Sequence, residues 1–242
     1  MEHISISSNV IFHIAGWPIT NSIIATWFAM FVIVLIAYFG TRKIHVIPKG
    51  MQNIVEFIVE ALSNLIQSVT QDVKKTTMFL PWIATFFLFI LLANWMELLP
   101  GFSAIIIKEG AENVPVLRSM NTDLNSTLAL AIISVVMIQV FGITSLGFGA
   151  YVKKYLNFSG VIDFFVGFLE IISEFARILS FAFRLFGNIF AGEVLLLVIT
   201  FLVPIIMPVP FYAMEIFVGF IQALVFSMLT IVFMSMATSK HA

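Results

Sequence analysis

The chain has 242 residues, of which 61% are hydrophobic and only 10% are charged, and its mean hydropathy is +1.09. A soluble domain carries about 25% charged residues, so this composition predicts an integral membrane protein. Lys and Arg number 12 against 13 Asp and Glu, and no basic patch in the sequence indicates nucleic-acid binding. With no cysteine, the chain forms neither disulfides nor thiolate metal sites.

The predicted elements are five apolar segments and one amphipathic segment. A transmembrane helix needs about 20 predominantly apolar residues. The segments that meet this requirement, in chain order, are residues 22–39, 76–96, 124–152, 163–203 and 205–239. After the first of them, residues 50–70 repeat apolar side chains with the spacing of an amphipathic helix on the inner membrane surface. We therefore predict an all-α, polytopic fold that forms a single membrane domain over residues 1–242.

The orientation in the membrane follows from Lys and Arg, which favour the cytoplasmic side. With five spans and the N-terminus outside, eight of these residues fall on the inner side, whereas Lys108 and Arg118 fall on the outer side. We therefore expect the N-terminus outside and the C-terminus in the cytoplasm. Residues 204–210 then form a tight outer turn between two long antiparallel helices.

Arg184 lies within the apolar fourth segment. A guanidinium stays protonated at every accessible pH, and placing it in hydrocarbon costs at least a few kcal/mol. At the helical period it shares one face, about 120° wide, with further polar residues. These are Glu170, Ser173, Glu174, Arg177, Ser180 and Asn188. We expect this stripe to face protein or water, although Arg184 could also be a structural counter-ion of Glu170 or Glu174.

A second polar group is predicted near the outer turn. Glu193 lies on the side of the fourth segment opposite the arginine, and Glu215 and Gln222 share a face of the last segment. Counted from the turn, Glu193 and Glu215 lie at comparable depth, with Asn188 and Gln222 somewhat deeper. We expect these four to cluster, the two glutamates sharing a proton site, although the two amides could be interhelical contacts instead. The last segment also carries a small-xxx-small run that permits close helix approach, Gly219, Ala223 and Ser227.

Four further polar residues lie near the outer ends of the second and third segments. Asn94 and Glu97 close the second segment, either as interfacial residues or as part of an outer ion path. Asp123 and Asn125 begin the third segment, either as helix caps or as path residues. The four histidines lie outside the spans without metal-ligand spacing, so we expect no metal and no cofactor.

Several segments resemble a known family. Residues 183–193 (FRLFGNIFAGE) resemble the signature of subunit a in the membrane (Fo) sector of bacterial F-type ATP synthases, and residues 221–226 (IQALVF) resemble its second signature. Residues 93–100, 122–126 and 169–173 are similar to further family segments in the same order. The resemblance covers almost the whole chain. It implies a long tilted helical hairpin against a rotating ring of c subunits, within a complex that includes peripheral b subunits.

The resemblance also implies roles for individual residues. Arg184 matches the arginine that faces the ion-binding carboxylates of the ring and separates two aqueous half-channels. The residues that match the outer half-channel are Asn188, Glu193, Glu215 and Gln222. The inner half-channel is matched by Glu170, Ser173 and Arg177, and we expect Glu174 to belong to it. Position 177 often carries lysine in the family, and some members carry histidine at position 215.

The resemblance, together with the polar stripe around Arg184, implies a proton-translocating stator subunit of a bacterial plasma membrane. This subunit would not itself be an enzyme. A sodium-translocating version is an alternative, because ion choice lies mainly in the ring. A secondary transporter would usually show an internal repeat with broken helices, and none is evident in the sequence. An intramembrane hydrolase would need a base within the spans, and the spans contain no histidine.

Overall fold

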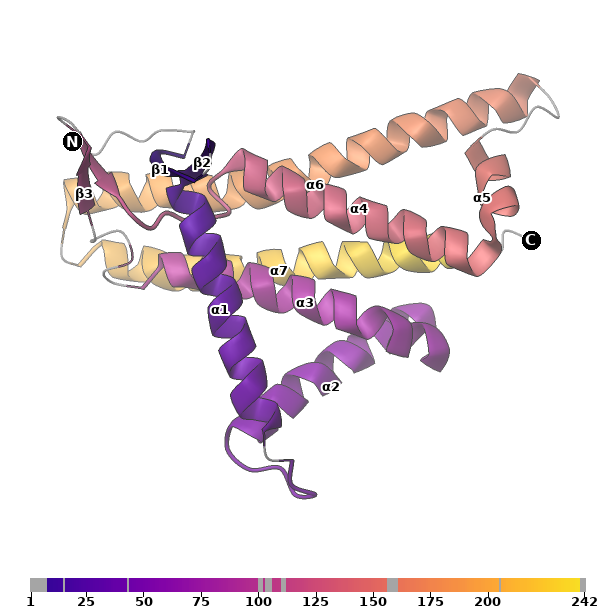
Figure 1. Cartoon of the computed structure of the whole chain (residues 1–242), viewed down its shortest axis with the longest axis horizontal. Coiled ribbons are helices and arrows are strands. Elements are labelled where there is room, and N and C mark those ends of the chain that lie inside the picture. The colour runs from indigo at the N-terminus through magenta and orange to yellow at the C-terminus, as the bar shows by residue number, and fades with distance from the viewer. Residues whose placement is uncertain are drawn as a thin grey trace.

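The structure, a computed structural model, describes residues 8–14, 16–42, 44–99, 102, 106–109, 112–155, 161–204 and 206–239. These residues form seven helices and two short β-hairpins (Figure 1). In this part of the chain, five helices are long and apolar enough to cross a membrane. They are α1 (Asn21–Thr41), α3 (Val73–Glu97), α4 (Leu124–Leu146), α6 (Val161–Leu202) and α7 (Pro208–Thr238). The prediction of an all-α polytopic membrane protein is confirmed.

The predicted amphipathic helix is α2 (Met51–Thr70). It buries Leu62 and Ile66 in the clusters that it shares with α3 and α7, whereas Ile54 and Phe57 of the same predicted apolar stripe are exposed. The helix is present where the apolar spacing predicted it, but only the later part of its apolar face packs into the bundle.

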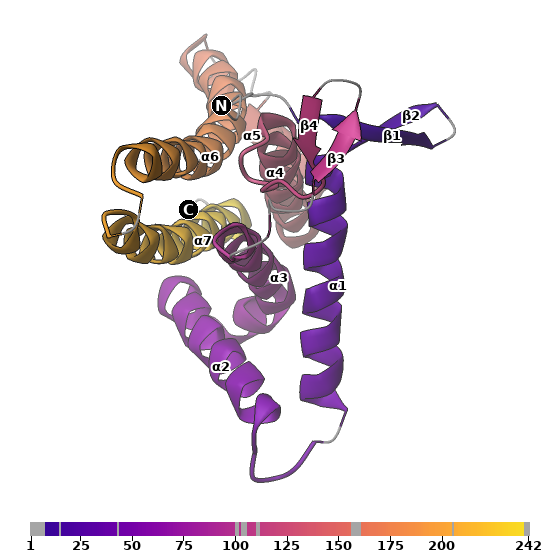
Figure 2. The same ribbon diagram turned by 90° about the vertical axis from the view of Figure 1, so that its left-hand side faces the viewer.

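Two antiparallel β-hairpins were not predicted from the sequence. Strand β1 (Val10–Ile14) pairs with β2 (Trp17–Thr20), and β3 (Ile106–Glu109) pairs with β4 (Glu112–Pro115). Both lie beside the start of α1 (Figure 2). Strands of four or five residues are too short to show a clear alternation in the sequence.

The third membrane helix is shorter than predicted. Helix α4 ends at Leu146 because Gly147 adopts a φ of +85°, a left-handed conformation that favours glycine. The chain then forms the separate helix α5 (Phe148–Tyr155), so the prediction of one span over residues 124–152 is wrong at its end. In Figure 1, α5 lies between the end of α4 and the start of α6.

Helices α6 and α7 form the predicted long hairpin. They contain 42 and 31 residues. At 1.5 Å per residue, both exceed the hydrocarbon core of a bilayer, which is about 30 Å thick. Helix α7 begins at Pro208, where proline costs no intrahelical bond, and Pro210 still lies in the first turn. Both helices cross α1 at a steep angle, as α3 and α4 also do (Figure 1).

The core joins α3, α4, α6 and α7. The ring of Phe226 on α7 lies with its centroid 5.0 Å from that of Phe181 on α6 and 5.8 Å from that of Phe86 on α3. Buried residues of α4, such as Ala131, complete this cluster. Helix α1 is peripheral to this core, since its buried residues Ala25 and Ala29 lie in a separate small cluster with Met96 of α3. The four-helix core therefore fixes the relative positions of the polar residues on α3, α6 and α7.

Candidate functional site

A cavity of about 210 Å³ lies between α3, α6 and α7, near the turn that joins α6 to α7. Its polar lining is Asn94 and Glu97 from α3, Glu193 from α6, and Tyr212 and Glu215 from α7. The predicted proximity of Glu193 and Glu215 is confirmed, and Glu97 joins them. The volume exceeds the roughly 30 Å³ that a water molecule occupies in the liquid. Three carboxyl groups around such a space can take up a proton and pass it on.

Glu215 reaches this cavity across Gly192 of α6. The Glu215 residue is 6% exposed, and a Cβ atom built on Gly192 would overlap its carboxyl group. Glycine at position 192 therefore provides the space that the carboxyl occupies. This requirement was not recognised in the sequence, although Gly192 stands directly before Glu193 in the family signature.

Asn188 and Gln222 form the second half of the predicted cluster. The Asn188 Nδ2 atom donates to Gln222 Oε1 over 2.6 Å, which links α6 to α7. Gln222 is buried, whereas Asn188 lies on an exposed part of α6. The four residues predicted to cluster thus form two pairs, the glutamates around the cavity and the amides about one and a half to two turns further from the hairpin connection.

Asn94 has a structural contact beside its place in the cavity lining. Its Nδ2 atom donates to the Gly219 carbonyl over 3.0 Å, and Trp95 Nε1 donates to the Ile216 carbonyl, also over 3.0 Å. The Asn121 amide donates to Asn94 Oδ1 over 2.6 Å. The first two bonds hold α3 against α7 at Gly219, where the small-residue run predicted a close approach.

Asp123 and Asn125 lie apart from the cavity lining. Asp123 is the N-cap of α4, and its Oδ1 accepts a hydrogen bond from the Asn125 backbone N–H over 2.9 Å. Its Oδ2 accepts from the hydroxyls of Ser8 and Ser22. The Asn125 side chain is exposed. Of the two alternatives for Asp123, a helix cap or a path residue, the structure shows the helix cap. Glu97, in contrast, lines the cavity.

Arg184 lies midway along α6 at the edge of its exposed face. The residue is half-buried, and its Nη2 atom donates to Ser180 Oγ over 3.2 Å. The neighbouring exposed surface of α6 is apolar, with Leu179 and Phe183 more than half exposed. At 1.5 Å per residue, Arg184 is about 14 Å from Glu193 along the helix. The arginine thus stands between the glutamate cavity and the polar residues at the other end of α6.

At that other end, Glu174 and Arg177 form an ion pair. The shortest distance between the Arg177 guanidinium and the Glu174 carboxylate is 2.7 Å. Glu170 is half-buried and Ser173 is exposed. Glu174 is therefore the counter-ion of Arg177, and its carboxylate is not the partner that the sequence alternative assigned to Arg184.

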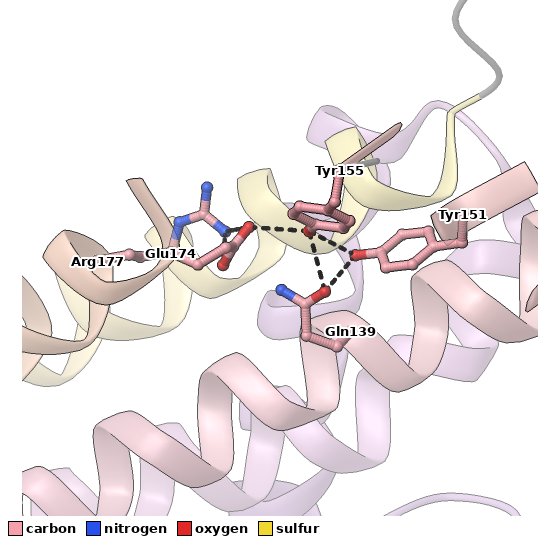
Figure 3. A network of polar contacts seen from close by, with 5 residues as sticks. All are labelled: Gln139, Tyr151, Tyr155, Glu174 and Arg177. Atoms are coloured by element: carbon pink, nitrogen blue, oxygen red, sulfur yellow. Dashed lines mark hydrogen bonds and ion pairs between the residues drawn. The ribbon is translucent and has the colours of Figure 1, made fainter. Parts of the chain in front are cut away.

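Sequence reasoning missed the aromatic partners of this ion pair. Gln139 of α4, with Tyr151 and Tyr155 of α5, contacts Glu174 through a chain of hydrogen bonds (Figure 3). The predicted third span, continuing through Val152, would place Tyr151 and Tyr155 away from α6. Their contact with Glu174 could therefore not be predicted from the sequence. Within the described ranges, no group of three or more His, Cys, Asp or Glu residues is arranged to hold a metal ion.

The fold and the site together define a multi-pass membrane protein with a charged, cavity-containing helical hairpin. Comparison with known proteins gives the family. The family described as ATP synthase A chain matches residues 23–235. The chain is 38% identical over 221 residues to ATP synthase subunit a of Gloeobacter violaceus, covering 91% of this chain and 85% of the relative. It is 29% identical over 231 residues to ATP synthase subunit a of Moorella thermoacetica, covering 96% of each. The chain therefore belongs to the ATP synthase subunit a family.

Proposed function

We propose that this protein is the proton-translocating stator subunit of an F-type ATP synthase in a bacterial plasma membrane. The observation that carries the proposal is the position of Arg184 on α6, between the glutamate cavity and the inner polar residues. Membership of the subunit a family supports it. In this assignment the N-terminus is outside and the C-terminus is cytoplasmic, which places the cavity in the outer half of the membrane.

A proton would enter through the cavity. Glu215 and Glu193 would take it up, with Glu97 as a third carboxyl group, and Asn188 and Gln222 would line the way toward Arg184. The acceptor would be a carboxylate on a ring of small subunits. The exposed apolar surface of α6 beside Arg184 suits such a partner, because a half-exposed cation on that face would be costly against lipid.

Arg184 would act on the ring carboxylate by opposite charge. A guanidinium favours the ionised carboxylate nearby and cannot itself relay a proton at ordinary pH. Once protonated, the ring carboxyl is neutral and can enter the lipid, where an ionised group would be far more costly. After nearly a full rotation it would release its proton toward Glu170 and Ser173.

The subunit makes no covalent change in this scheme, and the membrane potential supplies about 2.3 kcal/mol per charge per 100 mV. Its partners would be the c-subunit ring, the b subunits of the peripheral stalk and the remaining synthase subunits.

Sodium translocation by the same route is the second candidate. It stays a candidate because ion choice would lie mainly in the ring and not in this chain.

The proposal is tested by purifying the complex through a tag on this chain and reconstituting it in sealed vesicles. We expect a ring of small subunits to co-purify and a proton gradient to drive ATP synthesis without sodium. An active chain without the ring would contradict the stator assignment. Synthesis that requires a sodium gradient would support the sodium alternative.

A methyl group at position 192 should displace the carboxyl group of Glu215. Overpacking of this kind costs about 1–3 kcal/mol, so we expect Gly192→Ala to slow passive proton flux by about tenfold. Passive proton flux is measured per assembled complex, in membranes from which the catalytic part of the synthase outside the membrane has been removed. Gly149→Ala is the matched control, because no atom lies within 4 Å of a Cβ there. Unchanged flux in Gly192→Ala would show that the position of the Glu215 carboxyl is unimportant.

A large side chain at position 219 should separate α7 from α3. A Cβ on Gly219 would already lie 3.0 Å from the Asn94 Cβ and 3.4 Å from Trp95 Cδ1. We expect Gly219→Leu to reduce the amount of assembled complex severalfold, since the hydrogen bonds from Asn94 and Trp95 to α7 would be broken as well. Val136→Leu on the exposed face of α4 is the control. The measurement is complex abundance on native gels, and wild-type abundance with wild-type pumping would argue against close packing at Gly219.

A further inference from the structure

A connected polar network joins α4, α5 and α6 (Figure 3). It lies at the end of the bundle that the proposed function places on the cytoplasmic side. Tyr151 donates to Gln139 Oε1 over 2.5 Å, and Tyr155 lies 3.1 Å from the same oxygen. The Tyr155 hydroxyl also donates to Glu174 Oε1 over 3.4 Å. The network therefore ends on the carboxylate that pairs with Arg177.

Arg177 depends on Glu174 for its orientation. Its Nη1 atom donates to both carboxylate oxygens of Glu174, over 2.8 Å and 2.7 Å. Its guanidinium carbon also lies 3.9 Å from the ring centroid of Phe233 on α7, a cation–π contact. A shift of the Glu174 carboxylate would therefore move the cation on the boundary between α6 and α7.

Helix α5, which carries Tyr155, packs closely against α4 and α6. The Tyr151 ring packs against Gly142 of α4, where a Cβ atom would overlap the ring, and Tyr151 is 4% exposed. The backbone carbonyl of Tyr155 likewise packs against Gly167 of α6. Two glycines therefore allow α5 to lie close to both neighbouring helices.

The chemistry of Tyr155 suits a permanent donor. Burial, the hydrogen bond with Tyr151 and the charge of Glu174 all raise the pKa of Tyr155 above its ordinary value, so the phenol keeps its proton. Two neutral oxygens compete for this one proton: Gln139 Oε1, which already accepts the shorter bond from Tyr151, and the Tyr151 hydroxyl, 3.3 Å away. An ionised acceptor forms the stronger hydrogen bond, so Glu174 is the favoured acceptor of the Tyr155 proton.

We infer that Tyr155 is a positioning residue of the inner path, whose hydroxyl holds Glu174 and thereby fixes Arg177 against Phe233. In this role the Glu174–Arg177 pair is a fixed, charged wall of the path and does not carry protons. The inference rests on the proposed function, because it concerns the path that the proposal assigns to this end. It also changes the expectation from the sequence, in which Glu174 was a member of the proton path.

Tyr155→Phe tests the inference, since it removes the hydroxyl and keeps the ring. We expect passive proton flux per assembled complex to fall about three- to tenfold, the range expected from losing part of a hydrogen bond to a charged group. Glu174→Gln should lower the flux at least as much. Because Tyr155 acts through Glu174, the double variant should be no slower than Glu174→Gln alone. Tyr38→Phe, on an exposed tyrosine of α1, is the matched control.

Wild-type flux in Tyr155→Phe, or additive losses in the double variant, would overturn the inference. A purely structural brace would lower the amount of complex and leave the flux per complex unchanged, which would also overturn it. If Tyr155→Phe does not assemble, Glu174→Asp tests the same contact, because it keeps the charge and withdraws the carboxylate. Unchanged flux in Glu174→Asp would then overturn it. Failure of the proposed function would look different, because wild-type complexes themselves would conduct no protons.

Discussion

Arg184→Ala is expected to abolish proton-driven ATP synthesis while the complex still assembles. The residue is half-buried at the edge of the α6 surface, so its loss removes a charge without leaving a large cavity in the core. Without the cation, a ring carboxylate would have no fixed opposite charge to favour its ionised form between the two half-paths. Synthesis is measured in inverted or reconstituted vesicles under an imposed proton gradient, together with the amount of complex.

The passive proton leak distinguishes a lost barrier from a lost path. We expect the Arg184→Ala complex to conduct protons at least as well as wild type, since the barrier between the half-paths is removed. Arg184→Lys should also fail in synthesis, because an ammonium lacks the planar guanidinium fork and can titrate when buried. Proton-driven synthesis by Arg184→Ala at normal complex levels would refute the role assigned to this residue.

Removal of both outer carboxylates is expected to have the second largest effect. Glu193 and Glu215 line one cavity from antiparallel helices, so either can partly replace the other. Glu193→Gln and Glu215→Gln should each slow passive proton flux without stopping it, and the double variant should reduce it to background. The flux is measured in membranes without the catalytic part of the synthase, at matched amounts of complex.

The third carboxyl group of the cavity provides the comparison. Glu97→Gln alone should slow the flux less than the double variant, because it leaves Glu193 and Glu215 in place. Asp123 is unsuitable as a control, since it caps α4 and accepts from two serine hydroxyls. If the double variant conducts as well as wild type, the two glutamates are structural and the outer path runs elsewhere.

The elements with a regular apolar pattern could be predicted from the sequence. The spans starting near residues 22 and 76, the long hairpin and the amphipathic helix all follow from helical periodicity and length. The end of α4 could not be predicted in this way. Residues 147–152 are uncharged, and only the positive φ of Gly147 distinguishes a helix end from a continuing span.

The candidate site was predictable where it depended on one helix at a time. The helical projection placed Glu193 away from Arg184, and the count from the turn brought it to the depth of Glu215. Contacts that depend on a third helix were not predictable. Glu97 joins the cavity, and Tyr155 reaches Glu174, only because α3 and α5 pack on the hairpin in a particular register. Periodicity gives the face of a helix but not its partner.

In the proposed function, two half-paths open to opposite sides of the membrane and Arg184 separates them. The chain contains no cysteine, so single cysteines can be introduced without background. Leu196→Cys places a thiol in the cavity lining, Ser173→Cys places one at the other end of α6, and Ile138→Cys is a buried control. A small, membrane-impermeant thiol reagent is then added to one side of sealed vesicles. We expect Leu196→Cys to react only from the outside, Ser173→Cys only from the inside and Ile138→Cys from neither side. Reaction of both path positions from the same side would refute the arrangement of two separate half-paths.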